Sequence, residues 1–496
     1  MSYYRRVNSY NRAMIGRYRN YIPLILSLVL SACAVNPVTG NRDFVTVSES
    51  EEVAQGRQYH QSIIEQYGVY DDADLQSYVN TIGQQLAANS HRAHLKFHFI
   101  ILDSPDINAF ALPGGYVYIT RGIMAYLDNE AELAGVLGHE IGHVTARHSV
   151  RQQSGQLASG LLNVLITAAT GSESLGRLSK QLSTGITRGY GRKHELEADR
   201  LGAEYLHKSA YNPEVMINVI GVLKDQELYE KALAEKQNRP ANIYHGVYST
   251  HPKNDERLKT VIRAAKNLSP VQYRDNNQAA YFKLIDGLAW GQSADQGVIL
   301  QNRFMHAKLG IALQFPRHWQ VTNNPNSLFA RNHESGALAQ LSLQTLGKDE
   351  NSTGLLRRLT NNSKLSVENM AYGVTARSQA SIAGKSQPAR ISAIKLDEKQ
   401  VLFIAGTSAS DKFAATDLEL LAINASFSRL SDKQIKDIRT PMLKIIEVKA
   451  GDKYSSLASQ SAINHDVENI LRLLNRAFPD RTISASQKLK VIVLAD

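Results

Sequence analysis

The spacing of hydrophobic residues changes along the chain and predicts both helices and strands in its first half. Residues 75–86 carry apolar side chains every three or four positions, which is the period of a helix with one buried face. Residues 95–102 and 116–120 are short runs rich in aromatic and β-branched side chains, as strands are, and Pro113-Gly114-Gly115 between them indicates a turn. Helical spacing returns in residues 129–148. The first half is therefore expected to combine helices with a small sheet.

The pattern changes again after about residue 270, where several short segments alternate like strands. These segments are 308–321, 337–346, 389–394, 401–405 and 423–427, with a helical segment at 354–372 among them. They predict a small α+β sandwich over residues 300–432. This segment has no chemical signature, so we interpret it as a substrate-holding or partner-docking module. A chain of 496 residues is also too long for one ordinary core, so two or more domains are expected.

The predicted helix 129–148 contains the sequence His139-Glu140-Ile-Gly-His143. The two histidines are four residues apart, so on a helix their imidazoles lie on one face and could hold one metal ion. Glu140 points about 100° around the helix, toward the side of the metal where a water could bind, and is therefore placed to act as a general base. Catalytic zinc needs at least one more protein ligand and an open position.

Residues 193–199 predict a second helix that supplies this ligand. Glu195 and Asp199 are spaced i, i+4 and share one face. Glu195 can bind the metal, and Asp199 can orient a ligand histidine through its other ring nitrogen. Glu197 is expected to be a surface or salt-bridge residue, and His194 and His148 are expected to be solvated, because none of the three shares the metal-facing spacing.

Two further segments could take part in substrate access. Asn108, Ala109, Phe110 and Ala111 come directly before the predicted turn, and a strand next to a zinc helix commonly offers an edge to which an extended peptide adds. Residues 157–169 predict an apolar helix, which could be a core helix or a cover over the cleft. The core interpretation is favoured, because such helices are usually just packed.

The charge of the chain gives little reason to expect a nucleic-acid partner. Formal net charge is +10, but half of it comes from five arginines before residue 20. They are Arg5, Arg6, Arg12, Arg17 and Arg19. The excess over the rest of the chain is mild, and we expect no nucleic acid as partner.

The arginine-rich start precedes an apolar stretch, residues 21–32, that is too short to span a bilayer and has the length of a signal-peptide core. It ends in Ser31-Ala32-Cys33, which resembles a bacterial lipobox, and Cys33 is the only cysteine of the chain. We expect a signal peptide over residues 1–32, a lipid on Cys33 and a tether over residues 33–45. Ala34 after the cysteine favours the outer membrane of a Gram-negative bacterium, on its periplasmic side. The alternative is an ordinary secretory peptide with an incidental cysteine.

Five motifs in order resemble the zinc metallopeptidases related to HtpX, the CaaX prenyl protease and the periplasmic protease BepA. They are Asn108-Ala-Phe-Ala, Pro113-Gly-Gly, His139-Glu-x-x-His143, Glu195-x-x-x-Asp199, and Ser249-Thr-His-Pro252 followed by Asp255-Glu-Arg-Leu258. The resemblance implies a catalytic domain over residues 46–270.

The same resemblance assigns roles within that domain. His139, His143 and Glu195 would hold one Zn²⁺ per chain, and Glu140 would be the general base. His251 would either stabilise the oxyanion or move onto the metal as an inhibitory fourth ligand, although a capping or core histidine before Pro252 is the alternative. Arg257 is interpreted as a scaffold ion-pair partner rather than a catalytic group.

The last segment, residues 440–496, predicts strand, helix, helix and strand, and resembles a LysM module, a fold that binds N-acetylglucosamine chains of peptidoglycan. Lys453 and Ser486 depart from the common LysM pattern. Two alternatives stay open. The segment binds glycan, which would make peptidoglycan a partner, or it keeps the LysM fold for another role. If glycan binds, Gly451, Asp452 and Asn475 are expected near the groove.

The fold class expected from these patterns is α+β: a mainly helical zincin-type metallopeptidase domain with a small sheet, a sandwich-like α+β domain and a βααβ LysM-like domain. The expected function is a periplasmic zinc endopeptidase, anchored to the outer membrane, that degrades misfolded or stalled envelope proteins. A catalytically silent chaperone or assembly factor is the alternative, and the intact Glu140 argues against it. A peptidoglycan hydrolase is disfavoured, because the site is built on a peptidase motif.

Overall fold

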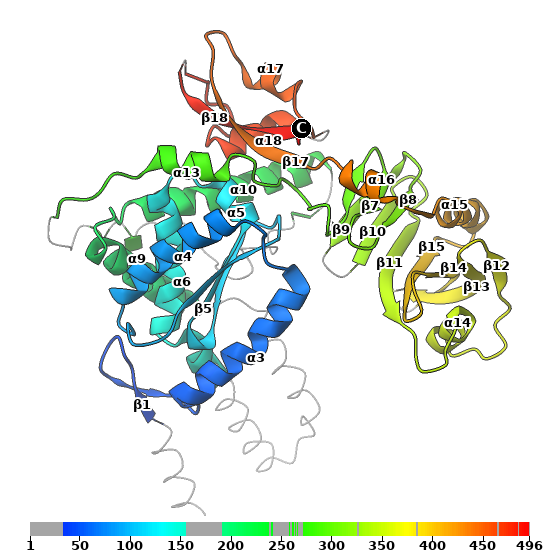
Figure 1. Cartoon of the computed structure of the whole chain (residues 1–496), viewed down its shortest axis with the longest axis horizontal. Helices are drawn as coiled ribbons and strands as arrows, with labels where there is room; N and C mark the ends of the chain where they lie inside the picture. The colour runs from blue at the N-terminus through cyan, green and yellow to red at the C-terminus, as the bar shows by residue number, and fades with distance from the viewer. Residues whose placement is uncertain are drawn as a thin grey trace, which may run out of the picture. The chain divides into compact units, whose positions relative to one another are not determined.

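The computed structural model describes most of the chain and divides into two compact units (Figure 1). The described residues are 33–154, 191–237, 240–241, 257, 260–261, 263, 265, 271–324, 327–382, 385–463, 466–484 and 486–495. The first unit runs to Ile285 and also takes in Glu447–Tyr454 and Glu468–Leu489. The second unit comprises Asp286–Ile446, Ser455–Val467 and Lys490–Asp496. None of the helices that the structure describes has the length and hydrophobicity that a bilayer-spanning helix needs.

The first unit is built around one central helix. Its helices are α3 (Glu49–Tyr67), α4 (Ala73–Ala88), α5 (Arg121–Tyr126), α6 (Glu130–Thr145), α9 (Arg192–Lys208), α10 (Val215–Lys236) and α13 (Gln278–Ile285). Helix α6 is buried along its whole length and packs against α4, α9 and α10. Its N-cap is Asn129, whose side chain accepts a hydrogen bond from the backbone N–H of Glu132. The helix with the metal-binding spacing is thus the core of the unit.

A three-stranded sheet lies beside α6 in the order β3-β5-β4. Its strands are β3 (His98–Leu102), β4 (Ala109–Leu112) and β5 (Tyr116–Thr120). Strand β3 runs parallel to β5, and β4 pairs antiparallel with β5 and is the last strand of this sheet among the described residues. The turn between β4 and β5 is a short 3₁₀ segment in which Gly114 has φ 77° and Gly115 has φ 93°. These left-handed conformations suit glycine, and they bring β4 back along β5.

The chain enters the first unit through a short hairpin. Strands β1 (Cys33–Val35) and β2 (Arg42–Phe44) pair antiparallel within the range expected to be a tether. Helix α3 then starts with a capping box formed by Ser48 and Glu51. Residues 1–32, which carry the expected signal peptide, lie outside the described part of the chain.

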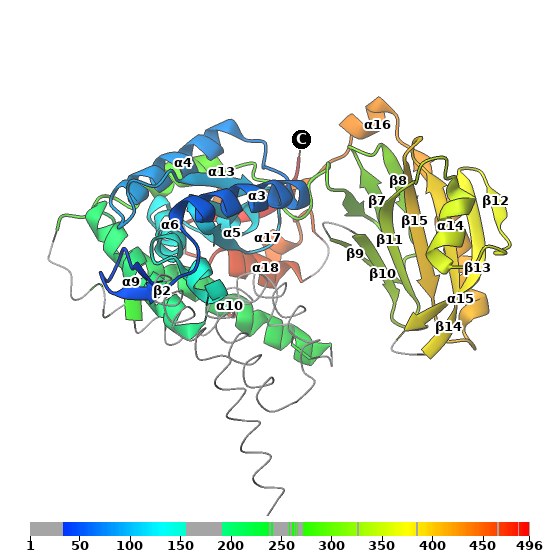
Figure 2. The ribbon, with the colours of Figure 1, turned by 90° about the horizontal axis from the view of Figure 1, so that it is seen from below.

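The second unit contains a seven-stranded antiparallel sheet in the order β12-β13-β14-β15-β11-β10-β9 (Figure 2). The strands are β9 (Trp319–Asn324), β10 (Ser327–Asn332), β11 (Leu338–Thr345), β12 (Glu368–Met370), β13 (Gly373–Ile382), β14 (Lys385–Lys395) and β15 (Gln400–Thr407). A smaller sheet has the order β16-β8-β7-β6. Its strands are β6 (Val298–Leu300), β7 (Arg303–His306), β8 (Ile311–Gln314) and β16 (Ser428–Arg429), and a short helix, α16 (Asp432–Lys436), follows.

Two helices cover opposite faces of the large sheet. Leu402 of β15 packs in one core cluster with residues of α15 (Phe413–Ala425). The neighbouring Val401 packs in another cluster with residues of α14 (Ser352–Thr360). Because successive residues of a strand point to opposite faces, α14 and α15 lie on opposite faces.

Three details of this unit differ from the sequence expectations. The expected strand 423–427 is mostly the end of α15, because a short apolar run does not distinguish a buried helix from a strand. The expected helix 354–372 ends at Thr360, where Asn361 adopts φ 50° and caps it. The expected strand 308–321 is two strands, β8 and β9, with Pro316 in the connection.

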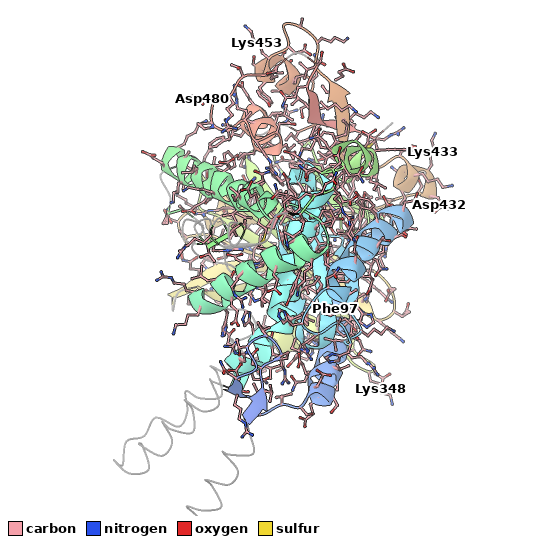
Figure 3. All side chains as sticks on the ribbon, turned by 90° about the vertical axis from the view of Figure 1, so that its left-hand side faces the viewer. Phe97, Lys348, Asp432, Lys433, Lys453 and Asp480 are labelled. Carbon is pink, nitrogen blue, oxygen red and sulfur yellow. The ribbon has the colours of Figure 1, made fainter. Side chains whose placement is uncertain are left out.

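The C-terminal segment follows the order strand, helix, helix, strand. Its elements are β17 (Pro441–Glu447), α17 (Tyr454–Ala458), α18 (Val467–Leu474) and β18 (Lys488–Leu494), and the two strands pair. Lys453, where the sequence departs from the LysM pattern, is exposed (Figure 3). The LysM resemblance of this segment stays a prediction.

Candidate metal centre

The candidate centre is formed where α6 and α9 pack closely together. A Cβ atom on Gly142 of α6 would lie 2.9 Å from the carbonyl oxygen of Ala198, and one on Gly202 of α9 would lie 3.0 Å from the backbone nitrogen of His139. Side chains at these positions would push the helices apart. The glycines therefore let the two helices approach, and this approach brings Glu195 to the histidines of α6.

His139, His143 and Glu195 converge with one ligand atom each within 4.8 Å of one another, and all three residues are buried. The two histidine Nε2 atoms are 3.0 Å apart, and each lies 3.5 Å from an oxygen of Glu195. Ligand atoms bound at about 2.0–2.2 Å in a tetrahedral arrangement lie roughly 3.3–3.5 Å from one another. The side chains therefore fit a small divalent metal ion, and two imidazoles with one carboxylate are a common catalytic donor set.

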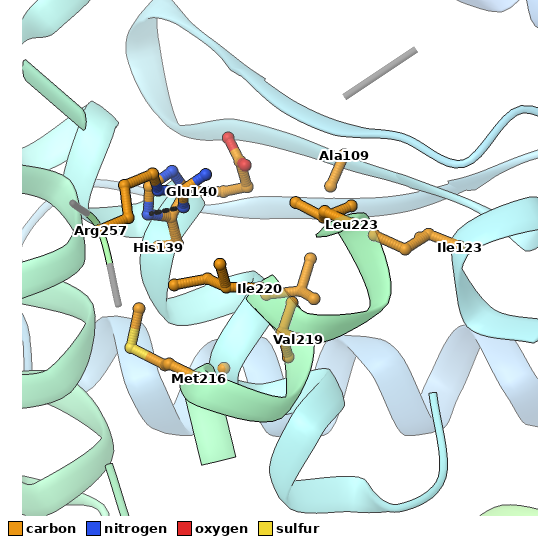
Figure 4. A pocket seen from close by; sticks show the side chains of 11 residues that line it. Ala109, Ile123, His139, Glu140, Met216, Val219, Ile220, Leu223 and Arg257 are labelled. Atoms are coloured by element: carbon orange, nitrogen blue, oxygen red, sulfur yellow. Dashed lines mark hydrogen bonds between the residues drawn. The ribbon is translucent and has the colours of Figure 1, made fainter. Parts of the chain in front are cut away.

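Glu140 is 2 % exposed and lines a pocket together with His139, Arg257 and Ala109 of β4. In Figure 4 its carboxylate lies between His139 and Ala109. The structure thus places the candidate general base between the metal ligands and the edge strand.

His139 is oriented by a carboxylate. Its Nδ1 lies 2.8 Å from an oxygen of Asp199, a fully buried residue. Arg257 donates two hydrogen bonds to the same carboxylate, from Nε at 2.9 Å and from Nη2 at 2.8 Å. Burial alone would raise the pKa of Asp199, but Arg257 and His139 outweigh it and the net pKa is lowered. Asp199 therefore stays ionised and leaves Nε2 of His139 for the metal.

His143 is oriented by His148, which was expected to be solvated. His148 is completely buried, and its Nδ1 lies 2.8 Å from Nδ1 of His143. Its Nε2 lies 3.1 Å from Glu197, which also accepts a hydrogen bond from Arg151 at 2.9 Å. The expectation for His148 is wrong, because α6 ends at Thr145 and the chain turns back at Arg147, where φ is 54°. Helical spacing could not predict the contact between His143 and His148, because it depends on the reversal of the chain after α6.

Glu197 is a salt-bridge residue, as expected, and it belongs to the site. Burial raises the pKa of its carboxyl, but hydrogen bonds from His148 and Arg151 outweigh burial and bring the pKa to about 2. His194, also expected in solvent, is half-buried and stacks on His148 with ring centroids 4.3 Å apart. Burial, together with His148 and Arg151, lowers its pKa to about 4.

The other predicted site residues fall into two groups. Asn108 pairs with Thr120 of β5 through its backbone, Phe110 stacks on Tyr118, and Ala109 faces the pocket, so residues 108–111 form the sheet edge near the metal ligands. His251 and its neighbours 249–256 lie outside the described residues, as do residues 157–169 with their predicted helix.

Comparisons with known proteins agree with this geometry. Residues 73–265 match the model of peptidase family M48. The chain is 33 % identical over 252 residues to the beta-barrel assembly-enhancing protease of Yersinia pestis, covering 49 % of each chain. It is 30 % identical over 245 residues to the protein of that name from Escherichia coli strain K12, covering 47 % of this chain and 48 % of the relative.

A mitochondrial protein is also similar in sequence to this chain. The metalloendopeptidase OMA1 of Schizosaccharomyces pombe is 29 % identical over 233 residues, covering 45 % of this chain and 64 % of the relative. The chain spans about half the length of the bacterial relatives. The matched region contains all the described residues of the metal centre, and residues 73–265 therefore form a domain of peptidase family M48.

Proposed function

We propose that the protein is a zinc-dependent endopeptidase. The observation that carries the proposal is the placement of Glu140 beside the convergent donors of His139, His143 and Glu195, in a pocket that also includes the edge strand β4. The M48 domain and the metalloendopeptidase relatives support it. Two imidazoles and a carboxylate favour zinc as the metal.

The chain's own residues account for the steps of peptide hydrolysis. An extended substrate lies along β4, the last strand in the sheet order of the described residues. Glu140 accepts a proton from the attacking water and then donates it to the leaving amine. Zinc, when bound, supplies a Lewis acid for the scissile carbonyl and the water. By resemblance, His251 stabilises the oxyanion or blocks the metal.

The test compares the full-length protein with its Glu140→Gln variant for zinc content and for cleavage of unfolded casein. We expect equal zinc and a rate lowered about 10²- to 10⁴-fold in the variant, the usual contribution of general acid–base catalysis. Glu214→Gln, at an exposed position before α10, is the matched control and should cleave as the wild type does. A chelator should abolish cleavage, and added zinc should restore it.

Two outcomes would contradict the proposal. An unchanged rate in Glu140→Gln would remove its central step. Bound zinc without cleavage by the wild type, even after His251→Ala, would favour the chaperone or assembly-factor alternative.

The site of action is proposed from the N-terminal sequence and the relatives' name. The lipobox-like Ser31-Ala32-Cys33 supports a lipid anchor at the periplasmic side of the outer membrane. The name of the assembly-enhancing proteases supports misfolded or stalled envelope proteins as substrates. The LysM-like segment would hold the enzyme near peptidoglycan. Cys33→Ser should release the protein from the outer-membrane fraction, and retention of the variant there would exclude the anchor.

A further inference from the structure

The N-terminal segment, residues 33–47, is attached to the part of the chain that follows α6. Both belong to the first unit. The carboxylate of Asp43 in β2 lies 3.1 Å from Nε of Arg151. The backbone N–H of Thr46 donates to the hydroxyl of Ser154 at 3.1 Å, and Ser154 is completely buried. The range that the sequence predicts to be a tether is therefore held against the peptidase domain.

The hairpin holds Asp43 in place. Asp43 is paired with Ala34 in the register of β1 and β2. Its carboxylate accepts a hydrogen bond from the side chain of Asn36 at 2.6 Å, and Asn36 is itself buried. The amide oxygen of Asn36 accepts two further hydrogen bonds from backbone N–H groups of the turn. Because Asp43 is already ordered by the hairpin, its ion pair with Arg151 costs little additional side-chain entropy.

Arg151 connects Asp43 to the outer partners of a metal ligand. Its Nη1 donates to Glu197 at 2.9 Å, and the same carboxylate oxygen lies 3.1 Å from Nε2 of His148. The Nδ1 atoms of His148 and His143 are 2.8 Å apart. Four consecutive contacts of 2.8–3.1 Å therefore run from β2 to the metal ligand His143.

We propose that Asp43 is a positioning residue of the metal centre, so that the N-terminal hairpin directly after the expected lipid-attachment residue supports metal binding. An isolated ion pair between partly exposed side chains contributes little. Asp43 and Arg151 are not isolated, because the same guanidinium also binds Glu197. The inference rests on the zinc site of the proposed function but does not require proteolysis.

The effect passes through the charge and the position of Arg151. Its guanidinium lies between two carboxylates, and loss of the charge on Asp43 would remove one of them. Arg151 would then be less firmly placed, and its positive charge would be offset mainly by Glu197. Glu197 would hold His148 less firmly in the orientation that accepts the proton of His143. A ligand histidine with a weakened outer partner binds its metal less tightly.

The experiment measures the zinc affinity of the full-length protein and of its Asp43→Asn variant by competition with a chromophoric chelator. We expect the variant to lose about threefold to tenfold in affinity. This is less than the roughly 10- to 100-fold lost with a direct outer partner, because Asp43 acts through three other side chains. Asp71→Asn, the same change at an exposed position before α4, is the matched control and should bind zinc as the wild type does.

A double-mutant cycle distinguishes positioning of the ligand from general support of the fold. His148→Phe interrupts the connection to His143, so adding Asp43→Asn to this variant should cause no further loss of zinc affinity. A purely structural role would lower the affinity by the same factor in both backgrounds. Asp43→Glu keeps the negative charge and should retain most of the wild-type affinity.

The outcomes separate this inference from the proposed function. Equal zinc affinities of wild type and Asp43→Asn, or the same loss in both backgrounds, would overturn the inference and leave the zinc peptidase standing. Circular dichroism of the metal-free proteins should be identical, and a difference between wild type and Asp43→Asn would attribute the loss to unfolding and also overturn it. Absence of zinc binding by the wild type would overturn both.

Discussion

At the scale of single residues, the two ligand histidines have different outer partners. His139 faces the carboxylate of Asp199, and His143 faces the imidazole of His148. Two Nδ1 atoms 2.8 Å apart need one proton between them. If Nε2 of His143 binds the metal, its Nδ1–H donates to His148, and His148 carries its own proton on Nε2, facing Glu197. The position of the metal therefore determines the tautomers of both His143 and His148.

We predict that His148→Phe lowers zinc affinity about 10- to 100-fold, the usual effect of losing an outer partner of a ligand histidine. Phenylalanine keeps the stacking on His194 but removes the acceptor for His143. Competition with a chromophoric chelator measures the affinity without reference to activity. His207→Phe, on α9 away from the ligands, is the matched control. Equal zinc affinities for wild type and His148→Phe would show that the contact between His148 and His143 contributes only packing.

At the scale of elements, a buried ion pair ties α15 to the large sheet of the second unit. Asp417 of α15 accepts hydrogen bonds from Arg390 of β14, one of them from Nη2 at 2.9 Å, and both side chains are 2 % exposed. Arg377 of β13 donates to the same carboxylate. Hydrogen bonding to Arg390 lowers the pKa of Asp417. Removing the carboxylate would leave the buried Arg390 without its close partner, with only Glu368 at 3.8 Å from its Nη1.

We predict that Asp417→Asn lowers the free energy of unfolding of the second unit by about 3 kcal/mol, the cost of breaking a buried pair from one side. Both tryptophans of the chain, Trp290 and Trp319, lie in this unit, so tryptophan fluorescence during urea unfolding reports on it. Glu350→Gln is the control, because its partner Arg358 is 53 % exposed. Its effect should stay below about 1 kcal/mol.

The same pair sets a pH dependence. The pKa of Asp417 is lower in the folded state than its ordinary value of 3.8, so its contribution is fully present above about pH 4. It is lost as the pH falls through the folded-state pKa. The difference between wild type and Asp417→Asn should therefore shrink in acid, and a difference that is the same at every pH would contradict the ionic interpretation.

At the scale of the whole chain, the C-terminal segment contacts the start of the metal-binding helix within the first unit. Arg476 pairs with Asp128 at 2.8 Å and with Glu132 of α6, 344 positions earlier in the sequence. Glu132 is 1 % exposed and also accepts a hydrogen bond from Asn218 of α10. Phe478 packs edge-on against Tyr229 of the same helix. The segment is thus part of the support of α6.

We predict that Arg476→Gln destabilises the first unit by about 3 kcal/mol, because Glu132 stays buried and loses its cation. Differential scanning calorimetry of the full chain should show a lower transition for this unit, with tryptophan fluorescence of the second unit unchanged. Arg481→Gln, at an exposed position of the same segment, is the control. A wild-type transition in Arg476→Gln would show that the C-terminal segment does not support α6.

The sequence by itself determined what depends on local spacing. Positions i and i+4 share a helix face whatever surrounds the helix, so His139 with His143, and Glu195 with Asp199, could be paired before the fold was known. Helix starts with side-chain caps and the left-handed glycines of the β4–β5 turn are local for the same reason. Short apolar segments were ambiguous, because burial on all sides removes the periodicity, and 423–427 was assigned to the wrong element.

Only the tertiary structure decided which separate segments meet. His148 reaches His143 because the chain reverses after α6, and Arg257 reaches Asp199 from another segment altogether. The pocket beside Glu140 is lined by residues of β4, α5, α6 and α10, and Arg476 supports Glu132 from near the chain's end. These contacts depend on packing between elements, and packing depends on shape and burial in three dimensions rather than on spacing along the chain.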